Sequence, residues 1–176
     1  MFTSNRCDGN GSVGGAIYAS YNSTLVWSGE TLFLNNSGTV AGAIALQNSL
    51  GVWSELTNFT SNRATSSGGA LMILRSNISW SRSTVFFNNS CDIIGGGLLL
   101  LDDSRAEWSG DTVFWGNKAQ NGGGIYLSQR STLSWTGQTE FVHNIAEQNG
   151  GAIASTVYGV QSDNKESTLT LSLIHI

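Results

Sequence analysis

The chain contains one pair of adjacent carboxylates, Asp102 and Asp103, and this pair is the first place to look for chemistry. Arg105 and Glu107 follow within a few residues. Enzymes that cleave polysaccharides use carboxylates as general acids, bases or nucleophiles, arranged with basic partners. The comparable positions of the neighbouring repeats described below hold Ser76–Asn77 and Gln129–Arg130, which add no further acid. Asp102 and Asp103 are therefore weak catalytic candidates, and a solvated turn is the competing interpretation.

The cysteine and histidine residues are weaker candidates for a functional site than these carboxylates. Cys7 and Cys91 lie at equivalent positions three repeats apart. Strand spacing then separates them by ~14 Å, beyond the ~7 Å between Cα atoms that a disulfide can span. We interpret both as small buried apolar residues. His143 has no ligand cluster of metal-binding spacing around it, and His175 belongs to the C-terminal tail. We expect no metal and no cofactor.

The composition favours many short strands and turns. Of the 176 residues, 22 are Gly and none is Pro, and 11% are charged, against ~25% in an average protein. Such a chain, with regularly spaced aromatic residues, is typical of β-structure. The net charge is −4 and the basic residues are scattered, so nothing predicts nucleic-acid binding. The most apolar stretch, residues 93–101, is about half the ~20 residues that a membrane helix needs.

An internal repeat organises the whole chain. Phe recurs at intervals of 31, 26, 27, 28 and 27 residues, each time with Asn three residues later. Five of these Phe are preceded by Thr two residues earlier and by Trp six residues earlier. A block of small residues ending in Ile or Leu, such as "GGAI" or "GGAL", stands between each Asn and the next Trp. The repeated Phe are Phe2, Phe33, Phe59, Phe86, Phe114 and Phe141, and the Trp are Trp27, Trp53, Trp80, Trp108 and Trp135.

Within each repeat the local period is two, which indicates strands. In "STLSWTG", for example, Leu133 and Trp135 share one face. Three such alternating segments per ~27-residue repeat predict an all-β, right-handed parallel β-helix of about six rungs, with three short strands per rung. Leucine-rich and ankyrin repeats need helical or Leu/Asn patterns that the chain lacks. We expect the Phe, Trp and Thr columns to point inward. The Asn would form a hydrogen-bonded corner ladder with a left-handed backbone, and the glycines would supply turns and room beside Trp.

The two ends predict a piece of a longer solenoid. Residues 1–170 read as one β-helix segment, incomplete at both ends, with native rungs expected on either side. An excursion after Ser155 precedes "STLT" at 167–170, which copies the start of a Trp-containing segment. Residues 171–176, "LSLIHI", resemble the translated end of a sequencing adapter, and we expect them to be foreign to the native protein.

The pairing of "GGAI" with "FxxN" resembles the repeat of the chlamydial polymorphic membrane proteins. "FTSNRATSSGGAL" and "FVHNIAEQNGGAI" match that pattern most fully, while Ala41, Gly97 and Gly124 depart from it by one small residue for another. The resemblance implies an extracellular or cell-surface passenger domain, at the outer membrane if the source is bacterial, with adhesive rather than enzymatic work. The expected partners are a host-cell or matrix protein or a glycan, bound along a long face.

Two further hypotheses remain beside the adhesive stalk. A carbohydrate-active enzyme, a polysaccharide lyase or hydrolase, is the alternative that Asp102 and Asp103 would serve. An ice- or mineral-binding face would need a flat outward array of threonines, whereas the predicted Thr column points inward. Six Asn-x-Ser/Thr sequons could accept sugars in a eukaryotic secretory host, and they lie at Asn10, Asn22, Asn35, Asn58, Asn77 and Asn88.

Overall fold

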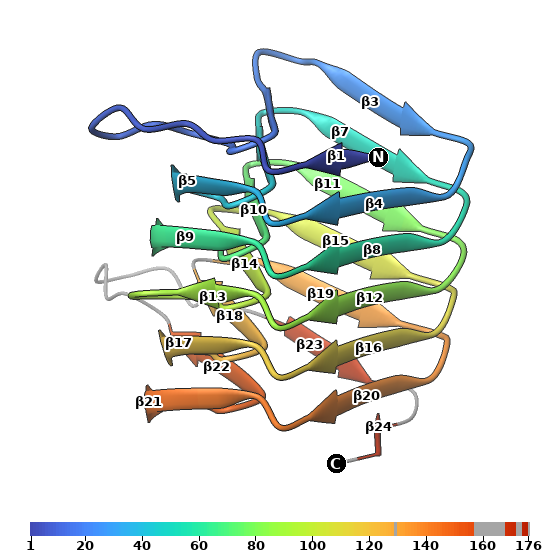
Figure 1. Cartoon of the computed structure of the whole chain (residues 1–176). Helices are drawn as coiled ribbons and strands as arrows, with labels where there is room; N and C mark the ends of the chain where they lie inside the picture. The colour runs from blue at the N-terminus through green and yellow to red at the C-terminus, as the bar shows by residue number, and fades with distance from the viewer. Residues whose placement is uncertain (129, 157–167, 172–173, 176) are drawn as a thin grey trace, which may run out of the picture.

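The computed structural model describes residues 1–128, 130–156, 168–171 and 174–175, and these residues form strands and turns without a helix. With the N-terminus uppermost, the chain crosses the near side from right to left along β4 (Figure 1). It returns across the far side from left to right along β7 and descends one rung with each circuit. The molecule is therefore a right-handed parallel β-helix of about six rungs, as the repeat predicts.

The rungs form four parallel sheets, which we call A to D in chain order. Sheet A consists of β1 (Phe2–Thr3), β4 (Thr31–Leu34), β8 (Thr57–Thr60), β12 (Thr84–Phe87), β16 (Thr112–Trp115), β20 (Thr139–Val142) and β24 (Ile174–His175). Sheet B consists of β5 (Ser37–Val40), β9 (Arg63–Ser67), β13 (Ser90–Cys91), β17 (Lys118–Asn121) and β21 (Ile145–Asn149).

Sheets C and D complete the circuit. Sheet C consists of β2 (Ile17–Ala19), β6 (Ile44–Gln47), β10 (Leu71–Leu74), β14 (Leu98–Leu101), β18 (Ile125–Ser128) and β22 (Ile153–Thr156). Sheet D consists of β3 (Thr24–Trp27), β7 (Leu50–Trp53), β11 (Asn77–Trp80), β15 (Arg105–Trp108), β19 (Thr132–Trp135) and β23 (Thr168–Leu171).

The repeated residues are in register, and this register builds the core. Phe pairs with Phe and Trp with Trp from rung to rung, and their ring centroids stack 4.5–5.2 Å apart. Both columns are buried with the Ile and Leu of sheet C in one interior cluster. The predicted inward columns are confirmed, and the exposed side chain of Ser81 confirms that the residue after Trp80 faces out.

The motif Asn forms a ladder inside the corner between sheets A and B. Asn89 Nδ2 donates to Asn117 Oδ1 (3.0 Å) and to the carbonyl oxygen of Phe59 (2.9 Å). Asn89 Oδ1 in turn accepts from the backbone N–H and the Nδ2 of Asn62. The amide of Asn89 therefore uses both its hydrogens and both its lone pairs in the buried interior.

Two local expectations about this corner and the glycines were wrong. The left-handed residue is the one before the motif Asn, for example Ser61 (φ 53°) and Asn88 (φ 51°), because bending there turns the Asn side chain inward. The paired glycines make room for backbone rather than for Trp. A Cβ added at Gly69 would lie 1.9 Å from the carbonyl oxygen of Gly96 in the next rung, and Gly68 has a positive φ of 65°.

Sheet B adds a fourth strand to five of the rungs, one more than the three expected. Its inward positions hold only small residues, of which Ala64, Cys91 and Ala119 form a small buried cluster. One inward side chain per strand gives too little apolar alternation to predict a strand from sequence. The ends of these strands fold back against sheet C, so Val40 and Ile94 pack on Met72, Leu99 and Tyr126. This second cluster buries side chains that alternation alone would place in solvent.

The C-terminal residues join the ladders where they are described. Leu171 pairs with Trp135 in sheet D, which is the position where the repeat predicts a Trp. Ile174 and His175 pair with Thr139 and Glu140 in sheet A, so part of the segment set aside as foreign has strand geometry. The excursion predicted after Ser155 falls mainly in residues 157–167, outside the described residues.

Candidate functional site

The acidic corner at Asp102 and Asp103 connects β14 to β15. Both residues have left-handed backbones, with φ of 51° and 59°, and they reach toward opposite neighbours. Asp102 Oδ2 accepts from Arg75 Nη2 of the preceding rung at 2.7 Å. Asp103 Oδ1 accepts from Arg130 Nε of the following rung at 2.6 Å. The structure thus brings these carboxylates to arginines on either side, in a ladder of exposed ion pairs; Gln129 lies outside the described residues.

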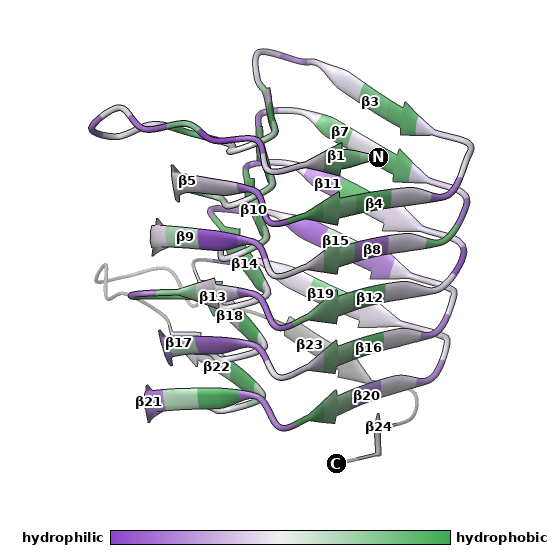
Figure 2. Ribbon diagram, viewed as in Figure 1, coloured by the Kyte–Doolittle hydropathy of each residue, from purple (hydrophilic) through white to green (hydrophobic). Residues whose placement is uncertain are grey.

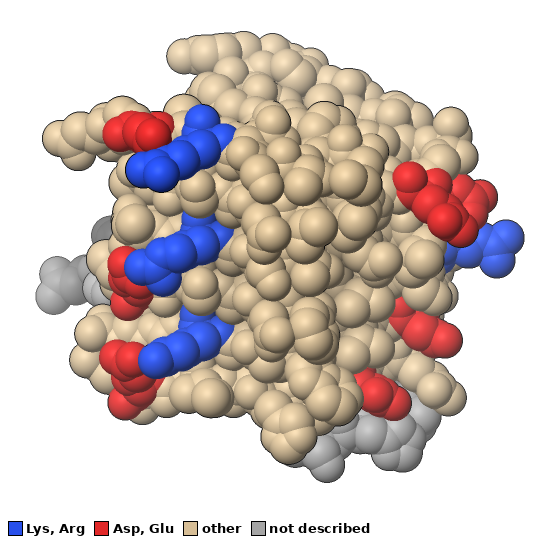
Figure 3. All heavy atoms as spheres, viewed as in Figure 1, with Lys and Arg blue, Asp and Glu red and all other residues tan. Residues whose placement is uncertain are grey.

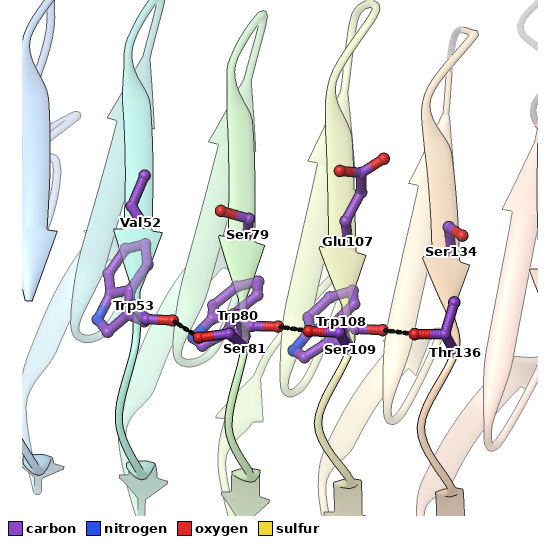
Figure 4. A pocket seen from close by; sticks show the side chains of 10 residues that line it. All are labelled: Val52, Trp53, Ser79, Trp80, Ser81, Glu107, Trp108, Ser109, Ser134 and Thr136. Atoms are coloured by element: carbon purple, nitrogen blue, oxygen red, sulfur yellow. Dashed lines mark hydrogen bonds between the residues drawn. The ribbon is translucent and has the colours of Figure 1, made fainter. Parts of the chain in front are cut away.

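A shallow groove of about 310 Å³ runs along the outer surface of sheet D (Figure 4). Its outward column holds Val52, Ser79, Glu107 and Ser134, and Figure 4 shows these side chains in line across four strands. Glu107 is the one carboxylate in this lining, and its Oε1 accepts from Arg105 Nε at 2.6 Å. The groove is lined by hydroxyl side chains and by residues of the Trp column, with a single, already paired acid.

A second column of hydroxyls borders the groove. Ser81 donates to the carbonyl oxygen of Trp53 (3.5 Å), Ser109 to that of Trp80 (3.3 Å) and Thr136 to that of Trp108 (3.5 Å). Figure 4 draws these bonds as a dashed line that crosses from rung to rung. These hydrogen bonds are long and their side chains are exposed, so each contributes little to stability, although it engages the hydroxyl hydrogen within the solenoid.

Glu107 and Asp103 each have a cationic partner. Glu107 lies on β15 and accepts from Arg105 Nε, whereas Asp103 lies at the preceding corner and accepts from Arg130 of the following rung. Nothing in the positions of these acids favours the alternative of a carbohydrate-active enzyme.

The outward face of sheet A carries exposed aromatic residues that the repeat does not require. We call the outward side chains of β4, β8, β12 and β16 the aromatic strip; they are Leu32, Leu34, Asn58, Thr60, Val85, Phe87, Val113 and Trp115. None of the eight is charged. The next strand, β20, places the exposed Glu140 beside Val113. Phe87 and Trp115 pair on neighbouring strands and are 38% and 42% exposed. Large aromatic residues in solvent mark interaction sites more often than single scattered aliphatic ones.

Charged side chains surround this strip. Figure 3 shows an uncharged band over the near face, with basic and acidic groups both on the left and on the right. Figure 2 shows hydrophobic residues along β4, β12 and β16, and its colours include the inward as well as the outward residues of each strand. On sheet B, Arg63 pairs with Asp92 at 2.8 Å and Lys118 with Glu147 at 3.2 Å. On the other side, the exposed Arg82 precedes β12 and has no acidic partner among the described residues, so the cations are neutralised only on the side of sheet B.

Polar groups without partners border the aromatic residues. The left-handed Asn88 directs its Oδ1 over Gly116, where an added Cβ would lie 2.3 Å from that oxygen. No side-chain hydrogen bond joins Asn88 or Thr60 to another described residue. His143 lies at the next corner with its ring at 76° to that of Trp115 and the centroids 5.4 Å apart. His143 is exposed at this corner.

The remaining candidates are dispersed. Cys7 and Cys91 are free; Cys91 is buried as expected, and burial raises the pKa of its thiol, whereas Cys7 is only half-buried, contrary to the expectation. Among the described residues, no group of three His, Cys, Asp or Glu side chains is placed to hold a metal ion. Five of the six sequon asparagines are exposed and Asn58 is half-buried. No helix in the described part of the chain has the length and hydropathy to cross a membrane.

Comparison of the chain with family models, curated proteins and solved structures finds no match. The resemblance to the chlamydial polymorphic membrane proteins accordingly rests on the repeated motifs alone, and it stays a prediction. Sequence reasoning found the weak acidic candidates but missed the aromatic strip. The signal was present, since Trp115 is the one Trp of six outside the Trp column, and Phe87 is the one Phe of seven outside the Phe column.

Proposed function

We propose that this β-helix is a non-enzymatic, surface-displayed or secreted rod segment that acts as an adhesive stalk. The observation that supports it best is the aromatic strip, which exposes Phe87 and Trp115 on an uncharged part of the outward face of sheet A. The strip lies on a stiff scaffold, because each strand beneath it is hydrogen-bonded to the rungs on either side. A rigid face exposing apolar area loses little conformational freedom on binding, which favours adhesion.

The distribution of charge supports the same proposal. Six of the eight basic residues form ion pairs with acids of the chain, and these are Arg6, Arg63, Arg75, Arg105, Lys118 and Arg130. A surface neutralised in this way presents no continuous basic stripe to a polyanion such as nucleic acid. The expected partner is a protein or glycan on a cell surface or in a matrix, and the expected location is extracellular.

Adhesion of particles coated with the whole chain tests the proposal. Beads carrying the protein should adhere to cultured cells or to immobilised matrix, and Phe87→Ala with Trp115→Ala should abolish most of that adhesion. Leu50→Ala is the matched control, because Leu50 is as exposed as Trp115 (42%) but lies on β7 of sheet D. Adhesion that survives the double substitution, or that falls equally with Leu50→Ala, would show that the aromatic strip is not responsible for adhesion.

A further inference from the structure

The aromatic strip has the chemical character of a carbohydrate platform, and this inference rests on the adhesive function proposed above. Phe87 and Trp115 supply two neighbouring aromatic rings. The axial C–H bonds of a pyranose carry a slight positive charge and are attracted to the negative face of an aromatic ring. A flat sheet face suits the flat side of a sugar ring better than it suits the knobs of a folded protein.

The absence of charge on the strip selects the class of glycan. None of its eight outward side chains is ionised at neutral pH, and the cations of sheet B beside it are paired with acids. Arg82 has no acidic partner among the described residues, but it precedes β12 and so lies at the opposite end of that strand from Phe87. Glu140, on the next strand beside Val113, is an acid and would repel an acidic sugar. A uronate or sulfate group bound here would lose its hydration without gaining a contact with a cation, and this loss costs free energy. A neutral sugar has no such cost, so the electrostatics of the strip favour it.

The polar groups beside the rings suit sugar hydroxyls. The Asn88 amide lies over Gly116, directly after Trp115, and the Thr60 hydroxyl lies on the strand next to Phe87. Neither side chain is engaged with another described residue, so both can donate and accept hydrogen bonds. The strip extends over four strands, or roughly 14 Å at ~4.8 Å per strand spacing. We infer that the aromatic strip binds a neutral glycan, with sugar rings stacked on Phe87 and Trp115 and hydroxyls hydrogen-bonded to Asn88 and Thr60.

Titration with defined oligosaccharides tests this inference. The probes are neutral oligomers of β-linked glucose, xylose, mannose and N-acetylglucosamine, with oligogalacturonate and heparin fragments as acidic comparisons. We expect at least one neutral oligomer to bind saturably and to shift the indole N–H resonance of Trp115. Trp115→Ala should weaken this binding by at least about tenfold, Asn88→Gly by less, and Leu50→Ala not at all. Gly retains the left-handed backbone of residue 88, so the second variant removes the amide without straining the corner.

The other outcomes would overturn either the glycan inference or the proposed adhesive function. Strip-dependent adhesion without binding of any neutral oligomer, or with preference for the acidic ones, would reject the glycan and leave the adhesive function intact. Adhesion that does not depend on Trp115 would reject the proposed function itself. A wild-type dimer in sedimentation that Trp115→Ala converts to a monomer would show that a second copy of the chain covers the strip, and would overturn the inference.

Discussion

The inward and outward sides of the same strands follow different rules. On β8, β12 and β16 the inward positions read Thr and Phe every time, whereas the outward positions read Asn-Thr, Val-Phe and Val-Trp. Inward residues stack on their own copies in the rungs above and below, so each position constrains the next. Outward residues contact solvent and are free to differ. The repeat therefore specifies the solenoid, and specificity for a partner must come from the positions that do not repeat.

Breaking an inward aromatic stack should have the largest effect. Trp80 lies in the middle of its column and is almost completely buried. Replacing Trp80 with Ala should lower the free energy of unfolding by about 3–5 kcal/mol through loss of apolar contacts and formation of a cavity. Ser81→Ala, one residue on and facing out, should change it by less than about 0.5 kcal/mol. Urea unfolding of both variants measures the difference, and similar losses at the two positions would refute the inward/outward assignment.

The Asn ladder gives the next largest effect. Asn89→Ala leaves the backbone N–H and the Nδ2 of Asn62 without their acceptor. It also leaves the carbonyl oxygen of Phe59 without its donor. Buried polar groups left unpaired cost about 1–3 kcal/mol each, so we expect a loss of about 2–4 kcal/mol after partial relaxation. Asn58→Ala on the outward face is the control and should cost less than about 0.5 kcal/mol. The ladder would be unimportant to stability if the two variants unfolded at the same urea concentration.

The Thr column allows a finer comparison between two inward residues of one kind. Thr57 Oγ1 donates to the carbonyl oxygen of Glu55 at 3.2 Å, whereas the buried Oγ1 of Thr112 has no partner among the described residues. Thr57→Val should therefore destabilise the protein by about 1 kcal/mol, and Thr112→Val should stabilise it by a similar amount. Thermal or urea unfolding tests the sign. Destabilisation by Thr112→Val would mean that water satisfies that hydroxyl inside the solenoid.

The sequence predicts most of the fold because the interior is a set of repeated columns. The regular spacing of the Phe, Trp, Thr and Asn residues predicts which residues pair between rungs, and the structure confirms this register. Sheet B escaped prediction because its inward residues, such as Ala64 and Cys91, are small and make a weak pattern. The burial of Met72 and Leu99 could not be foreseen either, since it depends on how sheet B folds back on sheet C.

The candidate site was harder to predict because its residues do not repeat from rung to rung. A search for chemistry selects residues by type, so it found Asp102 and Asp103, which the structure pairs with Arg75 and Arg130. Phe87 and Trp115 have the same residue types as the core and stand next to motif residues, so the sequence pattern does not distinguish them from core residues. They become visible as a site only once the repeat accounts for every other aromatic residue around them.

Hydrogen exchange at the indole N–H groups tests the inward/outward division most directly, because both kinds of Trp appear in one spectrum. Single Trp→Phe variants assign the resonances. The account predicts strong protection at Trp53, Trp80, Trp108 and Trp135, whose Nε1 atoms are buried, and rapid exchange at Trp115, which is 42% exposed. Rapid exchange at all of these positions, or protection of Trp115 equal to that of Trp80, would contradict it.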